Sequence, residues 1–168
     1  SFYVTKKYLV DDWLRTLWKC RRENFEPFTR NERVHMVDQI TQALTMIHMK
    51  DANVNLKPEN ILIQQDRIVL DDPYLLVGRQ EVPPEHGEFL LADHYLAPEQ
   101  LSEPEVERKE SDIYALGLIV GEILVGKPVK PEVPLSEQGT ILSQELDELF
   151  VTATAKDPND RYSSIGLM

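Results

Sequence analysis

The chain has 168 residues, 42% of them hydrophobic, which fits one domain with a single well-filled core. Its formal net charge of −11 at pH 7 argues against nucleic acid or an anionic membrane surface as the main partner. The single cysteine excludes an internal disulfide and a cysteine-based metal site, and fits a reducing, cytoplasmic compartment. We recognise no signal peptide and no transmembrane run in the sequence.

The start of the chain predicts a strand and then a helix. Residues 2–9 are rich in aromatic and β-branched side chains, which indicates a strand. Asp11 or Asp12 then precedes apolar residues at helical spacing. We therefore expect a capped helix with one apolar side, formed by Trp13, Leu14, Leu17 and Trp18.

A capping box begins the next predicted helix. Thr29 is its N-cap, and Glu32 lies three residues later, where its side chain can reach back. Apolar residues then recur at steps of three and four, which predicts a long amphipathic helix to about Met49 with an apolar face of Val34, Val37, Ile40, Leu44 and Ile47. After a polar loop, two β-like runs at 61–63 and 68–70 flank turn-forming residues and predict a hairpin.

The most informative stretch is ESDIYALGLIVGEILVG, residues 110–126. Ser111 and Asp112 are good N-cap residues, and Gly126 supplies a stop. Between them the apolar residues would lie on nearly every side of a helix, so we expect a helix over 111–126 that is buried on every side. It is too short, and too interrupted by Glu122, to span a bilayer. The rest of the chain must therefore cover this helix.

The segments on either side of the central helix are less regular. Residues 72–96 form a long irregular segment, and residues 97–101 predict a one-turn helix with proline in its first turn. Beyond the central helix, residues 127–140 form a Pro-rich connector. Ser143 then caps a helix that Pro158 ends, with an apolar face of Leu146, Leu149, Phe150 and Ala153. The last four residues read as the start of another helix.

Several short strings of this sequence resemble, in their order, the C-terminal lobe of eukaryotic-type protein kinases. They are LKPEN at 56–60, an aspartate after a short strand at Asp72, YLAPEQ at 95–100, the central helix itself, and DPNDRYSS at 157–164. The resemblance covers nearly the whole chain. It implies a mainly α fold, a protein-kinase-like C-lobe in which helices surround a central buried helix beside a short β-hairpin.

The resemblance also divides the chain into the parts of that lobe. They are a hinge strand at about 1–9, a catalytic-loop region at 50–72, an activation segment at 72–99, the central helix at 111–126 and terminal helices at 142–168. The N-lobe, which carries the Gly-rich loop and the lysine that pairs with the ATP phosphates, is absent from this chain. We expect an N-lobe or a partner chain to pack on the hinge end.

The catalytic loop departs from the family's pattern. Its His-Arg-Asp triplet falls on Asn53, Val54 and Asn55. The family's aspartate accepts the hydroxyl proton, but Asn55 presents an amide that cannot, a loss typically worth roughly 10²–10⁴ in rate. Val54 replaces the arginine that would bind a phosphorylated activation segment, and residues 72–99 contain no Ser or Thr to carry a phosphate. No catalytic residue is intact.

Other functional positions of the family are retained. Lys57 matches its substrate-phosphate lysine, Asn60 a metal ligand and Asp72 the main Mg²⁺ ligand, which implies a site where ATP and Mg²⁺ can bind. A structural role is the alternative, because Asn60 can bond backbone within its loop and Lys57 can pair with a carboxylate. The family's Asp-Phe-Gly reads Asp-Pro-Tyr at 72–74, so the glycine that lets this turn switch is lost.

Residues that hold the family's lobe together are kept. Glu99 and Arg161 match its buried ion pair, and Asp112 matches the residue that accepts backbone N–H groups of the catalytic loop. No metal-ligand spacing links the histidines, which we expect to be surface or satisfied side chains: His35, His48, His86 and His94.

Retained scaffold residues beside altered reaction residues imply a pseudokinase that binds other proteins, as a scaffold or allosteric subunit. Two alternatives stay open. One is a weak or atypical Ser/Thr kinase that binds ATP and Mg²⁺ with an N-lobe outside this fragment. The other is a stand-alone, non-catalytic C-lobe interaction module.

Overall fold

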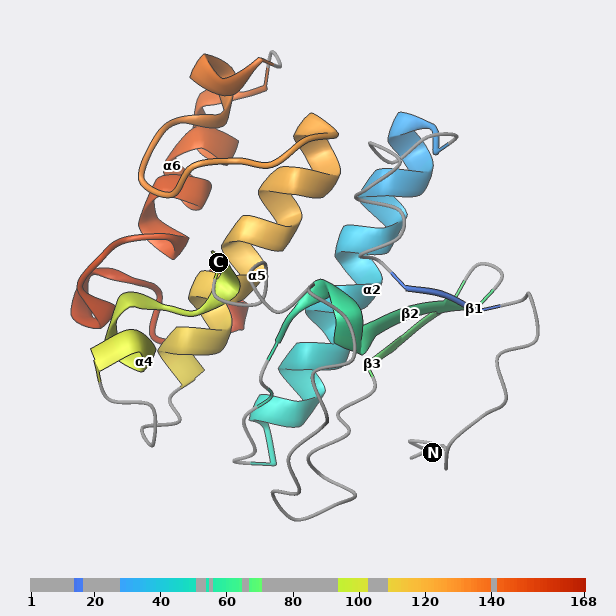
Figure 1. Ribbon diagram of the computed structural model, residues 1–168, viewed down its shortest axis with the longest axis horizontal. Helices are drawn as coiled ribbons and strands as arrows, with labels where there is room; N and C mark the ends of the chain where they lie inside the picture. Colours follow the sequence, from blue (N-terminus) through green and yellow to red (C-terminus); the bar gives the residue numbers. More distant parts are fainter. Residues whose placement is uncertain are drawn as a thin grey trace, which may run out of the picture.

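Three α-helices dominate the computed structural model, which describes residues 14–16, 28–50, 54, 56–64, 67–70, 94–102, 109–139 and 142–168. They are α2 (Arg30–His48), α5 (Lys109–Val125) and α6 (Gln144–Ala153). In Figure 1, α5 lies between α6 and α2, and a small sheet lies beyond α2. The mainly α, kinase-like C-lobe predicted from the sequence is confirmed. The strand predicted at 2–9 lies outside the described residues.

The sheet has three antiparallel strands in the order β1-β2-β3, namely Leu14–Thr16, Ile61–Gln64 and Arg67–Leu70. The β2–β3 hairpin was predicted, but β1 was not. The helix expected after Asp12 is wrong at residues 14–16, where Leu14 pairs with Gln64 and Thr16 with Leu62. Helical spacing was misleading because cross-strand hydrogen bonds to a distant segment decide the structure there.

Helix α2 begins at the predicted capping box. The Thr29 hydroxyl accepts the Glu32 N–H at 3.3 Å, and the Thr29 N–H donates to the Glu32 carboxylate at 2.7 Å. The buried face follows every fourth residue, Met36, Ile40, Leu44 and His48. Val34, expected on this face, is half-exposed. The buried face formed by Met36, Ile40, Leu44 and His48 therefore faces α5.

Helix α5 is buried along its length, as its sequence indicates. Every residue from Ser111 to Ile123 is buried, and Gly126 ends the helix in the left-handed region with φ of 84°. The predicted start is wrong by two residues, because the helix begins at Lys109 and Asp112 therefore lies in the first turn. Asp112 does not act as a cap, since its carboxylate binds groups from other segments.

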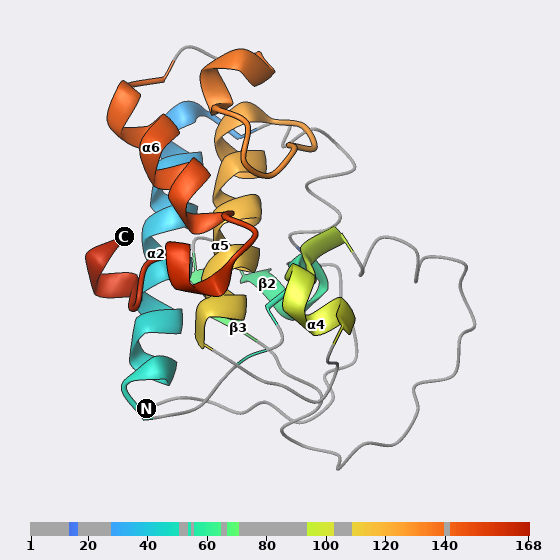
Figure 2. The same cartoon turned by 90° about the vertical axis from the view of Figure 1, so that its left-hand side faces the viewer.

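In the C-terminal part, α6 packs directly against α5, and the 3₁₀ turn η3 (Leu135–Gln138) of the connector contacts both helices. Ser143 precedes α6 in the extended conformation expected of an N-cap, but the helix ends at Ala153, before the predicted stop. Two single 3₁₀ turns follow, η4 (Pro158–Asp160) and η5 (Ile165–Leu167), so the helix expected at the last four residues is only a turn. Figure 2 shows α6 and these turns beside α5 and α2. No helix among the described residues is long and apolar enough to cross a membrane.

We expect Gly121→Ala to destabilise the fold. A Cβ at this position would lie 2.7 Å from Cε2 of Phe150 and 3.1 Å from Cδ2 of Leu135. Overpacking should outweigh alanine's better helix propensity and lower the free energy of unfolding by about 1–2 kcal/mol. Urea unfolding would measure this, with Gly166→Ala as the control because, apart from Gly166 itself and its two chain neighbours, no heavy atom lies within 4 Å of the added Cβ. Equal stabilities of the two variants would contradict the prediction.

Candidate functional site

The loop after α2 is fixed to the central helix by backbone hydrogen bonds from Val54 and Leu56 to the Asp112 carboxylate. The Val54 N–H donates to Oδ2 of Asp112 at 2.9 Å, and the Val54 side chain is 3% exposed. The buried Leu56 follows, and then the 3₁₀ turn η1 (Pro58–Asn60) leads directly into β2. The structure thus brings Asp112 to the backbone of the predicted catalytic loop.

A second element meets the same carboxylate. Nε2 of His48, in the last turn of α2, lies 2.9 Å from Oδ2 of Asp112, and both side chains are buried. Burial raises the pKa of the Asp112 carboxyl above its usual value, although the hydrogen bonds from His48 and Val54 act in the opposite direction. The carboxylate therefore joins α2, α5 and the loop. Sequence reasoning missed this role of His48, yet the four-residue spacing of the α2 face includes it.

The residues that the resemblance assigns to a nucleotide site are described only in part. Asn60 is buried in η1, and its N–H donates to the Lys57 carbonyl at 3.0 Å. Asn60 offers a hard amide oxygen and Lys57 an ammonium, the donor types that suit Mg²⁺ and phosphate. Asn55 and Asp72 lie outside the described residues. Within the described ranges, no three His, Cys, Asp or Glu side chains lie close enough to hold a metal ion.

The structure brings Glu99 and Arg161 together in a two-pronged ion pair. Nη1 and Nη2 of Arg161 donate to Oε1 and Oε2 of Glu99 at 2.7 and 2.8 Å. The Arg161 side chain is 0% exposed and that of Glu99 13%. Arg161 also donates to the backbone carbonyls of Ala155 and Glu110 at 2.7 and 3.0 Å, and its guanidinium lies 4.9 Å from the centre of the Tyr114 ring. The pair joins α4 (Pro98–Ser102) to the chain beyond α6.

The Glu99 carboxylate is held in its charged form. Burial alone would raise its pKa, but hydrogen bonds from Arg161 and from the Ser111 hydroxyl, at 2.7 Å, outweigh burial and lower the pKa below its usual value. Ser111 lies in the first turn of α5. The ion pair therefore also fastens α4 to the start of the central helix.

A buried carboxylate near the end of α5 was not predicted to have a role. Glu122 is 1% exposed, and its Oε2 accepts the Tyr95 hydroxyl at 2.6 Å. Nε2 of His94 lies 3.4 Å from Oε1 of the same carboxylate. A lone carboxylate in an otherwise apolar helix was the available sequence signal, because such a group needs partners when it is buried.

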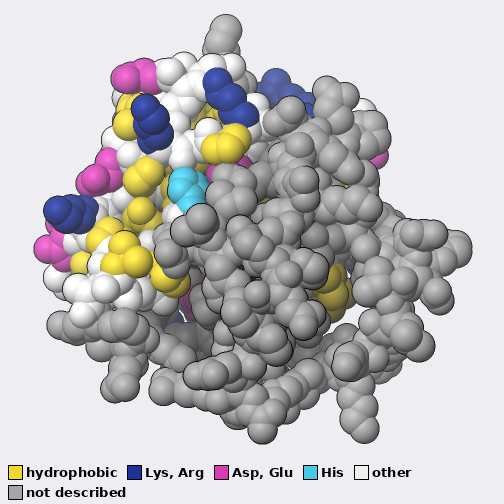
Figure 3. All heavy atoms as spheres, in the orientation of Figure 1, with side chains coloured by type: hydrophobic (Ala, Val, Ile, Leu, Met, Phe, Trp, Pro, Cys, Tyr) yellow, Lys and Arg dark blue, Asp and Glu magenta, His cyan; other side chains and the backbone are white. Residues whose placement is uncertain are grey.

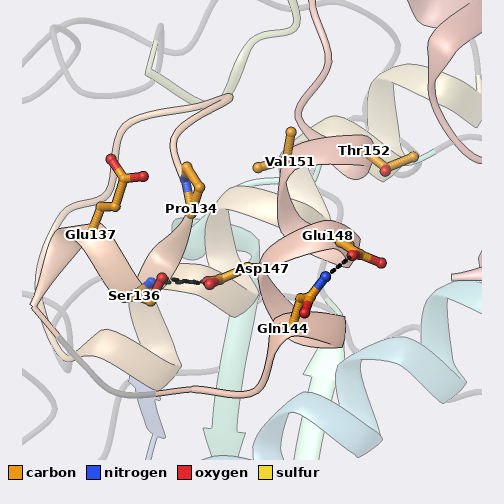
Figure 4. A pocket seen from close by; sticks show the side chains of 8 residues that line it. All are labelled: Pro134, Ser136, Glu137, Gln144, Asp147, Glu148, Val151 and Thr152. Carbon is orange, nitrogen blue, oxygen red and sulfur yellow. Dashed lines mark hydrogen bonds between the residues drawn. The ribbon is translucent and has the colours of Figure 1, made fainter.

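A separate cavity of about 480 Å³ lies between η3 and α6 and is drawn in Figure 4. Its lining includes the carboxylates of Glu137, Asp147 and Glu148, and Asp147 already accepts hydrogen bonds from Ser136. It contains none of the residues that the resemblance singles out.

On the described part of the face in Figure 3, acidic and basic side chains are scattered among apolar ones, without a large patch of one sign.

The buried central helix with its Asp112 contacts, together with the Glu99–Arg161 ion pair, defines a protein-kinase-like domain. The chain belongs to the protein kinase domain family, whose model matches residues 1–165. The chain is 29% identical over 156 residues to the serine/threonine-protein kinase PrkC of Bacillus subtilis, covering 82% of this chain and 24% of that protein. It is 31% identical over 126 residues to cyclin-dependent kinase F-4 of rice, Oryza sativa subsp. japonica, covering 74% and 27%.

The fold is also that of a solved kinase domain. The crystal structure of the Mycobacterium tuberculosis PknI kinase domain aligns with a TM-score of 0.62 at 22% identity, covering 89% of this chain and 58% of that one. At this identity the likeness concerns the fold alone. The chain spans about a quarter of the length of the two curated relatives.

We expect Arg161→Met to destabilise the fold strongly. The substitution leaves the Glu99 carboxylate largely buried without its cation, a loss that typically costs about 3–5 kcal/mol. Chemical denaturation would measure the change, with the exposed Lys156→Met as control. A loss below about 1 kcal/mol, the size typical of an exposed pair, would contradict this account.

The ion pair also predicts an acid-dependent stability. Because folding lowers the pKa of Glu99, its contribution is fully present above the unfolded-state value near 4.5 and is lost as the pH falls through the lower folded-state pKa. The difference in unfolding free energy between the wild type and Glu99→Gln should therefore be largest near neutral pH and shrink below about pH 4.5. Denaturant titrations across this range would measure the difference. A constant difference would be the contrary result.

Proposed function

We propose that this chain is a catalytically inactive protein-kinase-like domain, a pseudokinase, that acts by binding other proteins as a scaffold or allosteric subunit. The observation that carries the proposal is the hydrogen bond from the Val54 N–H to Asp112. It supports the register in which Val54 takes the place of the family's arginine and the next residue, Asn55, the place of its catalytic aspartate. An amide at that position cannot accept the proton of a substrate hydroxyl.

The surroundings of Val54 add a second line of support. Its side chain is apolar and packs in the core, so it cannot bind a phosphate from the activation segment. The sequence agrees, because residues 72–99 carry no Ser or Thr. Tyr74 and Tyr95 are the only hydroxyl side chains of that segment. Loss of both the receiving arginine and the Ser and Thr residues removes the usual electrostatic means of ordering it. The domain is thus proposed to present one fixed surface rather than a phosphorylation-dependent one.

Nucleotide binding is the point on which the alternative of a weak or atypical kinase depends. If ATP and Mg²⁺ bind, Asn60 and Asp72 would hold the metal and Lys57 a phosphate, and the metal would neutralise phosphate charge. The backbone bond from Asn60 to Lys57 holds both residues in one turn, which favours keeping this alternative in the test. An N-lobe outside this fragment would have to supply the remaining contacts.

A thermal-shift titration of the full-length protein with ATP, with and without Mg²⁺, tests the proposal. A ligand that binds only the folded state raises stability by RT ln(1 + [L]/Kd). We expect millimolar nucleotide to leave the unfolding temperature of the wild type and of Asp72→Ala unchanged. A Mg²⁺-dependent rise that is lost in Asp72→Ala would instead favour the weak-kinase alternative, and Asp160→Asn, an exposed carboxylate elsewhere, serves as the control.

A further inference from the structure

The walls of the cavity between η3 and α6 are held in place by the fold. On the η3 side, the Leu135 side chain is 1% exposed and anchors the turn in the core. The Ser136 N–H donates to Oδ1 of Asp147 at 2.9 Å and the Ser136 hydroxyl to the other oxygen, which joins η3 to α6. The Gln138 side chain also donates to the Val133 carbonyl at 2.7 Å. The cavity is therefore formed before any ligand binds, as is usual for binding sites.

Each side of the cavity contributes a carboxylate that has no cation beside it. Glu137, on η3, is exposed, and its side chain forms no hydrogen bond or ion pair with another described residue. Glu148, on α6, is exposed and accepts only the neutral amide of Gln144, at 2.8 Å. Figure 4 shows these two carboxylates on opposite sides of the cavity. Among the described residues that line it, none is Lys, Arg or His.

Helix stability accounts for only part of this negative charge. Acidic residues in the first turn of a helix counter its dipole, which gives Glu145 and Asp147 a structural reason. Glu148 lies beyond the first turn of α6, and Glu137 belongs to a different element. Like charges on the two sides of one cavity repel each other, so a cation bound between them would be stabilised by both.

The rest of the lining indicates which kind of cation fits. Pro134 and Val151 line the cavity and are partly buried, and Lys and Arg side chains pack their methylene stems on such apolar surface. A metal ion fits less well, because no three His, Cys, Asp or Glu side chains of the described ranges lie close enough to hold one. The volume of about 480 Å³ lies within the range of about 300–1,000 Å³ that is typical of ligand sites. The cavity therefore has room for a basic side chain together with its peptide neighbours.

We propose that this cavity docks a lysine- or arginine-bearing segment of a partner protein. A basic side chain of the partner enters between η3 and α6, with its stem on Pro134 and Val151 and its charged head at Glu137 and Glu148. The formal net charge of −11 adds long-range attraction for such a partner. The inference rests on the proposed function, because it names the kind of partner that a protein-binding domain with this surface would hold.

Fluorescence anisotropy with a labelled peptide of alternating arginine and alanine tests the docking, on the full-length protein at physiological ionic strength. We expect saturable binding with a Kd in the micromolar range, and no binding of the matched peptide that has glutamate in place of arginine. In Glu137→Gln/Glu148→Gln, the affinity should fall about tenfold, because two charge-assisted contacts are lost. Both positions are exposed, so we expect the double variant to fold like the wild type.

Matched variants separate docking at the cavity from attraction by net charge. Glu145→Gln/Asp160→Asn also removes two exposed carboxylates, but neither lines the cavity, and its affinity should stay within about twofold of the wild type. Val151→Lys places a cation in the cavity itself and should weaken binding, whereas Ser163→Lys, exposed elsewhere, should not. Urea unfolding of each variant would verify that the fold is kept.

Two results would refute the docking inference. One is that the arginine peptide does not bind to the wild type. The other is that the cavity variants and their controls lose affinity equally, which would mean attraction by net charge alone. Neither result bears on the pseudokinase proposal, which the nucleotide titration tests separately. A Mg²⁺-dependent shift with ATP would overturn that proposal and leave the peptide measurements as they are.

Discussion

Carboxylates on a helix that is buried on every side constrain the whole domain. Helix α5 has no exposed residue from Ser111 to Ile123, yet it carries Asp112 near one end and Glu122 near the other. A buried charge without partners is very costly, so each carboxylate must draw polar groups from other segments. The Asp112 carboxylate forms hydrogen bonds with His48 of α2 and the Val54 N–H, and the Glu122 carboxylate accepts the Tyr95 hydroxyl. The carboxylates thereby fix where loops cross the central helix.

This arrangement bears on the proposed function, in which a kinase-like lobe loses its reaction chemistry and keeps its fold. Asp112 accepts the backbone N–H of Val54, so this hydrogen bond does not involve the side chain at position 54. The ion pair between Glu99 and Arg161 bonds in addition to backbone carbonyls and to the Ser111 hydroxyl. Under the proposed function, the residue at position 54 can differ from the family's arginine while the Asp112 anchor is kept, because that anchor binds the backbone.

The sequence predicted the parts of this structure that local chemistry decides. The capping box at Thr29, the hairpin at 61–70 and the all-round burial of α5 follow from short patterns whose physical effect lies within a few residues. The pairing of Glu99 with Arg161 came only from the family resemblance, since 62 positions separate them. Neither spacing nor composition contains that contact.

What could not be predicted depends on distant partners. Strand β1 forms because Leu14 to Thr16 meet β2, a pairing that overrides the helical spacing of the apolar residues around it. His48 looked like any histidine at a helix end, and its role appears only when α5 supplies Asp112 beside it. Glu122 was read as an interruption of an apolar run because Tyr95 lies 27 positions earlier. In each case the deciding contact is tertiary.

Phosphate transfer by the full-length protein tests the central claim, that the lobe is retained without its chemistry. Radiolabelled ATP with Mg²⁺ would be incubated with the wild type, with Asp72→Ala and with a generic basic substrate. The account predicts the same background incorporation for both proteins, because Asn55 cannot take the hydroxyl proton. Incorporation by the wild type that disappears in Asp72→Ala would contradict the account and identify a working kinase.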